Sequence, residues 1–158
     1  MKKIVIAADK GGFPLKEVIK SYLSSQGHEV KDVGTLDVNE PVLFFDGASR
    51  ASKAIQDGIA EIGFLFCGTG MGMAQVANKF HGIRAAVCEN VFSAVKCREV
   101  NDSNILTMGT WIVAGETGIA MTKAFLETAF TQGLPKERAE YLKSTRESVI
   151  AIDDATRK

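Results

Sequence analysis

The segment EIGFLFCGTGMGMAQVANKF, residues 61–80, contains the pattern on which the fold depends. It begins with an apolar run that is typical of a strand buried on both faces of a sheet. The glycine-rich run CGTGMG follows, and the residues after it have the apolar spacing of a helix. The pattern therefore predicts a strand, a turn of bare backbone and a helix, with a thiol and a hydroxyl inside the turn.

The same alternation of strand and helix patterns continues on both sides of this segment. Strands are expected over residues 3–9, 28–34, 61–66, 83–88 and 104–109. Helical spacing separates them, and a last helix is expected over 138–155. Apolar strands that alternate with helices form parallel sheets covered on both faces. The sequence thus predicts a doubly wound, Rossmann-like α/β fold with a five-stranded parallel sheet, and residues 1–158 as one domain.

Composition excludes several classes of function. The chain has 158 residues, of which 46% are hydrophobic and 24% charged, which is ordinary for a globular protein. Its formal net charge of zero argues against nucleic acid as a partner. The N-terminal apolar run is too short for a membrane span or a signal peptide. The three cysteines form no CxxC pair, so neither a disulfide framework nor a zinc site is expected, and the cytoplasm is the expected compartment.

The binding site is expected where the strands end. Parallel α/β sheets bind ligands at the carboxyl ends of their strands, and glycine-bearing polar turns follow two strands, at residues 9–12 and 67–72. Gly68, Gly70 and Gly72 allow the backbone to approach a ligand closely. Because a helix is expected to begin near Gly70, free N–H groups would favour an anion or a developing oxyanion. A dinucleotide fingerprint would follow the first strand instead, which argues against a nicotinamide cofactor.

Two side chains in this turn have useful chemistry. Cys67 stands at the end of the strand, where the start of the next helix favours a thiolate. Thr69 adds a hydroxyl that both donates and accepts hydrogen bonds. A base and a hydroxyl beside backbone amides suit the removal of a proton next to a carbonyl group. The alternative is that Cys67 is only a small buried apolar residue.

A longer match extends this interpretation. Residues 64–109, FLFCGTGMGMAQVANKFHGIRAAVCENVFSAVKCREVNDSNILTMG, closely resemble the ribose-5-phosphate isomerase B and galactose-6-phosphate isomerase family. AADKGGFPLK, residues 7–16, is similar to that family's opening motif. The resemblance extends from Lys3 to Gly133. It implies an aldose–ketose isomerase that acts on a phosphorylated sugar through an enediol, without a metal or an organic cofactor.

The resemblance also assigns site residues and partners. It implies that Cys67 moves the proton between two carbons, that Thr69 assists at the oxygens, and that backbone amides of residues 70–74 stabilise the enediolate. The substrate-binding positions that it implies are Asp9, Lys10, Gly68, Gly70, Met71, Gly72, Ala74, Asn101 and Arg138. It further implies a homo-oligomer, a dimer or tetramer, whose site is completed by a neighbouring subunit that the C-terminal helix reaches.

Departures from the family pattern bear on the substrate. Val100 occupies the position of the histidine that opens a furanose ring, and it transfers no proton. Lys10 replaces another usual histidine, and Leu134 falls near the place of a second phosphate-binding arginine, for which Lys136, Lys10 and Arg146 are the candidate substitutes. A tetrulose 4-phosphate is therefore an alternative substrate, because its esterified O4 closes no furanose ring. Ring opening by another group is the competing explanation.

A second alternative is a non-catalytic, phosphosugar-binding subunit. The presence of both Cys67 and Thr69 argues against it.

Three aromatic residues also depart from the family. Trp111 stands where relatives often carry arginine, and it is expected to fill a groove rather than to make a contact between subunits. Phe44 and Phe45 stand where relatives carry Tyr-Pro, which predicts a different pocket wall.

Overall fold

The computed structural model describes residues 1–156, and its sheet has five parallel strands in the order β2-β1-β3-β5-β4. The strands are β1 (Lys3–Ala8), β2 (Glu29–Asp32), β3 (Ile62–Cys67), β4 (Ala85–Val87) and β5 (Ile105–Gly109). The helices are α1 (Phe13–Ser25), α2 (Phe44–Gln56), α3 (Met71–Ala77), α4 (Val91–Glu99), α5 (Gly115–Glu127) and α6 (Lys136–Thr156). The predicted doubly wound fold is confirmed.

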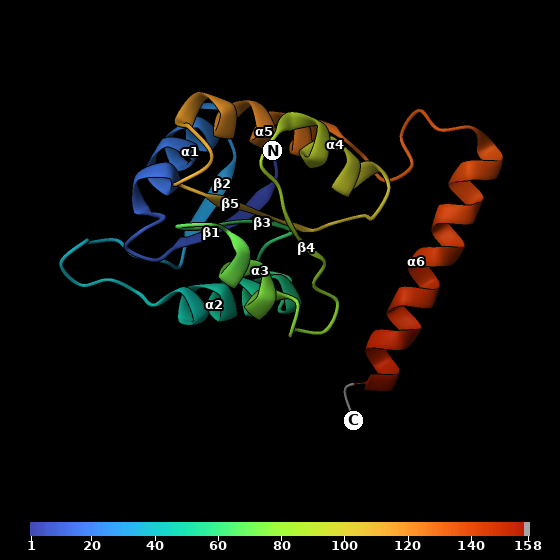
Figure 1. Cartoon of the computed structure of the whole chain (residues 1–158), viewed down its shortest axis with the longest axis horizontal. Coiled ribbons are helices and arrows are strands. Elements are labelled where there is room, and N and C mark those ends of the chain that lie inside the picture. Colours follow the sequence, from blue (N-terminus) through green and yellow to red (C-terminus); the bar gives the residue numbers. More distant parts are fainter. Residues whose placement is uncertain (157–158) are drawn as a thin grey trace.

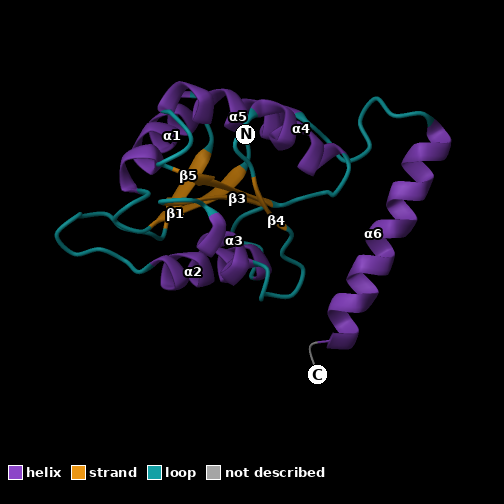
Figure 2. Cartoon of the chain, in the orientation of Figure 1, coloured by secondary structure: helices purple, strands orange, loops and turns teal. Residues whose placement is uncertain are grey.

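The helices cover both faces of the sheet. Helices α1, α4 and α5 lie on one face and α2 and α3 on the other, whereas α6 stands away from this body (Figures 1 and 2). The order of the strands reverses between β1 and β3, because the chain adds β2 on one side and β3 on the other. Ligands of doubly wound folds bind at such a switch point. The two glycine-bearing turns follow these two strands.

The central strand β3 joins the two hydrophobic cores. Alternate side chains of a strand point to opposite faces, so Phe64 and Phe66 pack in the core under α1 and α5. Leu65 and Cys67 pack in the core on the other face, with residues of α2 and α3. All six residues of β3 are buried. The catalytic candidate Cys67 is therefore anchored at the end of a fully buried central strand.

Several element boundaries differ from the prediction, most clearly in β4. Strand β4 spans three residues, Ala85–Val87, rather than all of 83–88. It lies at the edge of the sheet and pairs only with β5, so its flanking residues have no second strand to hold them in a ladder. Helix α6 begins at Lys136, two residues before the predicted start at 138. No helix among residues 1–156 is both long enough and apolar enough to cross a membrane.

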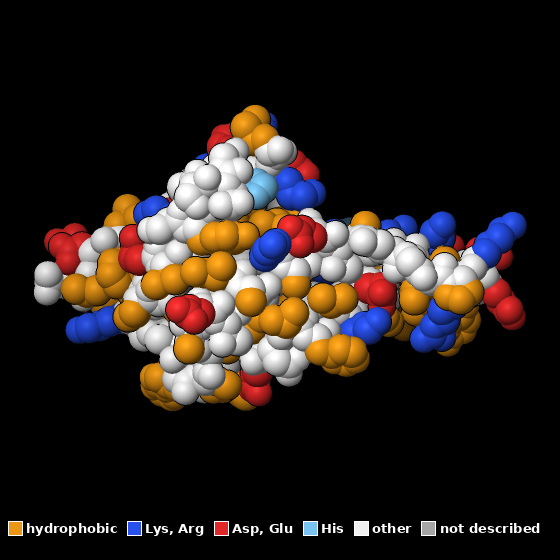
Figure 3. Space-filling view, turned by 90° about the horizontal axis from the view of Figure 1, so that it is seen from above, with side chains coloured by type: hydrophobic (Ala, Val, Ile, Leu, Met, Phe, Trp, Pro, Cys, Tyr) orange, Lys and Arg blue, Asp and Glu red, His pale blue; other side chains and the backbone are white. Residues whose placement is uncertain are grey.

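The surface carries both signs of charge. Lys and Arg side chains are interspersed with Asp and Glu side chains and with hydrophobic ones on the face that Figure 3 draws. This mixture agrees with the formal net charge of zero.

A buried lysine fixes the start of the loop that leads to α2. The side chain of Lys16 is fully buried, and its Nζ lies 2.6 Å from Oδ2 of Asp32. The same ammonium group donates a hydrogen bond to the carbonyl oxygen of Thr35. Lys20, which is 33% exposed, adds a second hydrogen bond to Asp32 at 2.8 Å. A buried charge is tolerated only when it is paired in this way.

We predict that Lys16→Met lowers the free energy of unfolding by about 3 kcal/mol, because the nearly buried Asp32 carboxylate loses its main partner. Lys20→Met is the matched control and should cost less than about 1 kcal/mol, since Lys20 is partly solvated. Urea unfolding followed by circular dichroism measures both values. Equal losses in the two variants would contradict the assignment.

Candidate active site

The turn after β3 is held by its own side chains. Gly70 adopts a left-handed backbone conformation, with φ of 78°, and caps the start of α3. This conformation lets the Gly70 amide donate a hydrogen bond to the sulfur of Cys67, at 3.1 Å. The Met71 amide donates to Oγ1 of Thr69 at 3.3 Å. Cys67 is 7% exposed. The thiol therefore sits at the edge of the core with an N–H group directed at its sulfur.

Three turns meet at this carboxyl edge of the sheet. The Asp9 amide donates to the carbonyl oxygen of Phe66 at 3.3 Å, and Oδ1 of Asp9 accepts from the Gly12 amide at 2.8 Å. A methyl carbon added at Gly11 would lie 3.5 Å from the amide nitrogen of Gly68. After β5, the Thr110 amide donates to the carbonyl oxygen of Cys67 at 3.0 Å. Residues 9–12 and 67–72 lie together, as the sequence predicts, and residues 109–111 join them.

The set of free amides is smaller than expected. Gly70 and Met71 donate to the side chains of their own turn, and the Ala74 amide donates to the carbonyl oxygen of Gly70 at 3.2 Å. Gly72 and Met73 remain in the first turn of α3, where amides have no partner within the helix. The amides available to a developing oxyanion are therefore those of Gly72 and Met73.

Two expected site residues are not near Cys67 in this chain. Asn101 follows α4 and precedes β5, whose first residue pairs with Gly63 near the start of β3. Cys67 pairs with Gly109 at the opposite ends of these two strands. Asn101 therefore lies toward the amino edge of the sheet. Arg138 lies in the first turn of α6, where its guanidinium carbon is 5.2 Å from the centre of the Tyr141 ring. A single chain does not bring these residues to the thiol, whereas Lys10 lies in the turn after β1, at the carboxyl edge.

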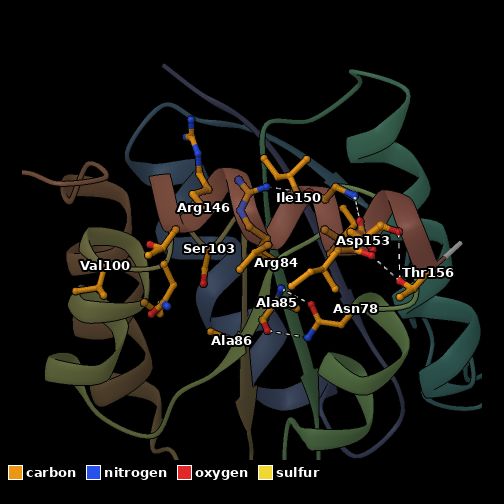
Figure 4. Close-up of a pocket in the computed structure, with 17 residues that line it drawn as sticks. Asn78, Arg84, Ala85, Ala86, Val100, Ser103, Arg146, Ile150, Asp153 and Thr156 are labelled. Atoms are coloured by element: carbon orange, nitrogen blue, oxygen red, sulfur yellow. Dashed lines mark hydrogen bonds between the residues drawn. The ribbon is translucent and has the colours of Figure 1, made fainter. Parts of the chain in front are cut away.

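A groove separates α6 from the body, with a volume of about 610 Å³. Val100 and Asn101 are among its lining residues, whereas residues 67–72 are not. Figure 4 shows Val100 and Ser103 toward one end of this groove, and Asp153 and Thr156 toward the other. The Gly82 amide donates to Asp153 at 3.1 Å, and His81 lies 2.5 Å from Asp154, so the end of α6 is tied to the turn before β4.

An arginine cluster beside this groove was not predicted. Asp102 has a positive φ of 51° and accepts from three guanidinium groups, those of Arg84 at 3.1 Å, Arg98 at 3.2 Å and Arg146 at 2.9 Å. Burial lowers the pKa of Arg84, and the carboxylate of Asp102 opposes this effect. Arg146, a candidate phosphate-binding residue, is instead engaged with Asp102. Arg98 is four positions from Asp102, but Arg84 is 18 and Arg146 is 44 positions from it, and no spacing pattern connects these two with the aspartate.

The other two cysteines belong to the core. Cys88 and Cys97 are 3% and 9% exposed. A hydrogen bond from the Cys97 thiol lowers the pKa of the Cys88 thiol to about 7. Both face the core under α4 and α5 rather than the turn at residues 67–72.

The fold and the site together define a class of protein. A parallel α/β sheet with an acidic turn, a thiol and free amides at its switch point has the features typical of a small-molecule enzyme site. A profile of the Ribose/Galactose Isomerase family matches residues 4–142.

Relatives cover almost the whole chain. The 4-deoxy-4-sulfo-D-erythrose isomerase of Clostridium sp. (strain MSTE9) is 51% identical over 153 residues, which cover 97% of this chain and 96% of that protein. The D-erythrulose-4-phosphate isomerase of Pectobacterium atrosepticum is 36% identical over 133 residues, which cover 84% of this chain and 88% of that protein. The structure of Clostridium thermocellum ribose-5-phosphate isomerase B superposes with a TM-score of 0.81 at 36% identity, over 92% of this chain and 96% of that chain. The chain belongs to the ribose/galactose isomerase family, and the predicted family and enzyme class are confirmed.

We predict that Gly70→Ala destabilises the protein by about 3 kcal/mol. A methyl carbon there would meet the carbonyl carbon of Met108 at 2.9 Å, in addition to the left-handed backbone strain. Gly82→Ala is the matched control, because Gly82 has φ of 75° but nothing within 4 Å of the added carbon. It should lose only about 1 kcal/mol. Thermal unfolding compares them, and similar losses would refute the packing argument.

Proposed function

We propose that residues 1–158 form a single aldose–ketose isomerase domain that acts on a sugar with a terminal anionic group, with Cys67 as the base. The observation that carries this proposal is the Cys67 sulfur, 3.1 Å from the Gly70 amide and at the switch point of the sheet. Thr69 and the turn that contains Asp9 lie beside it. A base next to amide donors is the arrangement required for proton transfer next to a carbonyl group.

The reaction needs one proton and no oxidant. The thiolate of Cys67 removes the proton from C2 of the aldose, and the electron pair of that bond forms the C1=C2 double bond of an enediolate. The negative charge then rests on the former carbonyl oxygen, where the amides of Gly72 and Met73 stabilise it. The Thr69 hydroxyl moves a proton between the two oxygens. The Cys67 thiol returns its proton to C1, which gives the ketose, so neither a metal nor an organic cofactor is invoked.

We propose a four-carbon substrate with a terminal phosphate or sulfonate. Val100 supports this length, because a side chain without a proton to transfer opens no ring. A tetrose with an esterified O4, or with sulfur at C4 in place of oxygen, has no hydroxyl with which to close a furanose. Two relatives are named for such substrates, a sulfo-erythrose and an erythrulose phosphate. Ribose 5-phosphate is the competing substrate.

We further propose that a second copy of the chain completes the site in a cytoplasmic homo-oligomer. Asn101 and Arg138 support this arrangement, since neither reaches Cys67 of the same chain. In a symmetric dimer, Asn101 and Arg138 of each subunit would lie at residues 67–72 of the other subunit, so both sites would be completed in the same way. Lys10 and the partner's Arg138 would then be the cations that face the substrate's anionic end.

We predict that Cys67→Ala lowers kcat at least about 1000-fold on D-erythrulose 4-phosphate while KM changes little, because only proton transfer is lost. Isomerisation in D2O should place deuterium at C2 of the aldose product. Cys88→Ala is the control and should keep its turnover, since Cys88 lies in the core. A Cys67→Ala variant of undiminished activity would show that Cys67 is not the base, whereas a wild type that binds the sugar phosphate without turning it over would favour a binding subunit over an enzyme.

We also predict that two impaired variants complement each other. Cys67→Ala and Asn101→Ala chains, unfolded and refolded together, should recover about a quarter of wild-type activity, because half of the dimers are mixed and each mixed dimer has one intact site. Refolding each variant alone is the control. If the mixture only averages the two parents, the site does not combine residues of two chains.

A further inference from the structure

Two aromatic rings border the turn at residues 68–72, one beside Gly68 and one beside Gly72. A methyl carbon added at Gly68 would lie 2.8 Å from the six-membered ring of Trp111. A methyl carbon added at Gly72 would lie 3.0 Å from the ring of Phe44. Each ring thus lies directly against the bare backbone of a glycine, one at each end of the turn that carries Thr69 and follows Cys67.

Both rings are open to solvent, although their backbones lie beside the turn. Trp111 is 79% exposed and Phe44 is 37% exposed, so neither is a core residue. The Trp111 amide donates to the carbonyl oxygen of Gly68 at 3.0 Å, which fixes that residue beside the turn. Phe44 is the first residue of α2, and its ring meets that of Phe45 edge-on, with centres 5.3 Å apart. Exposed rings fixed beside a site are suited to contact a ligand rather than to stabilise the core.

Their chemistry bears on the length of the substrate. The face of an aromatic ring offers a sugar hydroxyl only a weak hydrogen-bond acceptor, so a hydroxyl pressed against it in place of water loses most of its solvation. In the proposed site, a substrate whose reacting carbons lie at Cys67 would extend along the turn and past one or both rings. Each additional CHOH unit brings one more hydroxyl group toward a ring. A rigid aromatic wall therefore disfavours longer chains more than short ones.

We propose that Trp111 and Phe44 determine specificity, by limiting the site to short sugar chains with a terminal anion. This inference rests on the proposed isomerase function and extends it to the residues that set the number of carbons. Neither ring takes part in proton transfer. Loss of a ring should therefore widen the substrate range and leave the chemistry of the short substrate in place.

The test compares kcat/KM for D-erythrulose 4-phosphate and D-ribulose 5-phosphate in the wild type, Trp111→Ala and Phe44→Ala. The wild type should prefer the four-carbon substrate at least about 10-fold, the range that one carbon unit produces in a pocket. Each variant should lower that preference about 10-fold through a gain on the five-carbon substrate. Phe92→Ala is the matched control, since Phe92 is a 72% exposed aromatic residue on α4, outside the turn.

The possible results separate the specificity assignment of Trp111 and Phe44 from the proposed isomerase function. An unchanged ratio in both variants, or an equal loss on both substrates, overturns the specificity assignment and leaves the isomerase function standing. A wild type that prefers the five-carbon substrate overturns it as well. A wild type without isomerase activity on either substrate refutes the proposed function itself. Trp111→Leu and Phe44→Leu repeat the comparison if either alanine variant fails to fold by circular dichroism.

Discussion

The close packing of the turn after β3 against the end of β5 is the constraint on which the rest of the site depends. Gly109 has no room for a side chain, because an added methyl carbon would lie 2.5 Å from the carbonyl carbon of Thr69. Gly70 meets β5 in the same way and also needs a left-handed backbone. These contacts set the direction in which the chain leaves β3. The Gly70 amide consequently faces the Cys67 sulfur, and α3 begins beside it.

Charge is distributed unevenly between the two edges of the sheet. The carboxyl edge holds the thiol, the aspartate of the first turn and Lys10, and its donors are mainly backbone amides. Three arginines gather instead around Asp102, beyond the amino end of β5. Because each of them contacts that carboxylate, they stabilise the loop between α4 and β5 rather than bind a substrate at the distant turn. An isolated chain therefore holds the thiol and its amide donors together but has few cations near them.

The features of the fold and site that depend on local sequence patterns could be predicted from the sequence. The apolar strands, the helical spacing and the glycine turn predict the sheet, its covering helices and the position of Cys67, since each depends on neighbours in the chain. The length of β4 was missed because its pairing at the sheet edge depends on β5 alone. The use of the Gly70 and Met71 amides by Cys67 and Thr69 was also missed, because hydrogen bonds within a turn depend on backbone angles. The Asp102 cluster and the contacts of Trp111 and Phe44 join residues far apart in sequence, for which one sequence contains no pattern.

The attachment of α6 has a mechanical consequence. Arg146 ties the middle of the helix to Asp102, and Asp153 and Asp154 tie its end to Gly82 and His81. Contacts at two separate points along α6 restrict its rotation relative to the sheet, whereas a contact at one point alone would leave the helix free to rotate about it. These contacts hold α6 in one orientation relative to the sheet before any other molecule binds. A neighbour that docks along it meets a rigid template, and little conformational entropy is lost in that encounter.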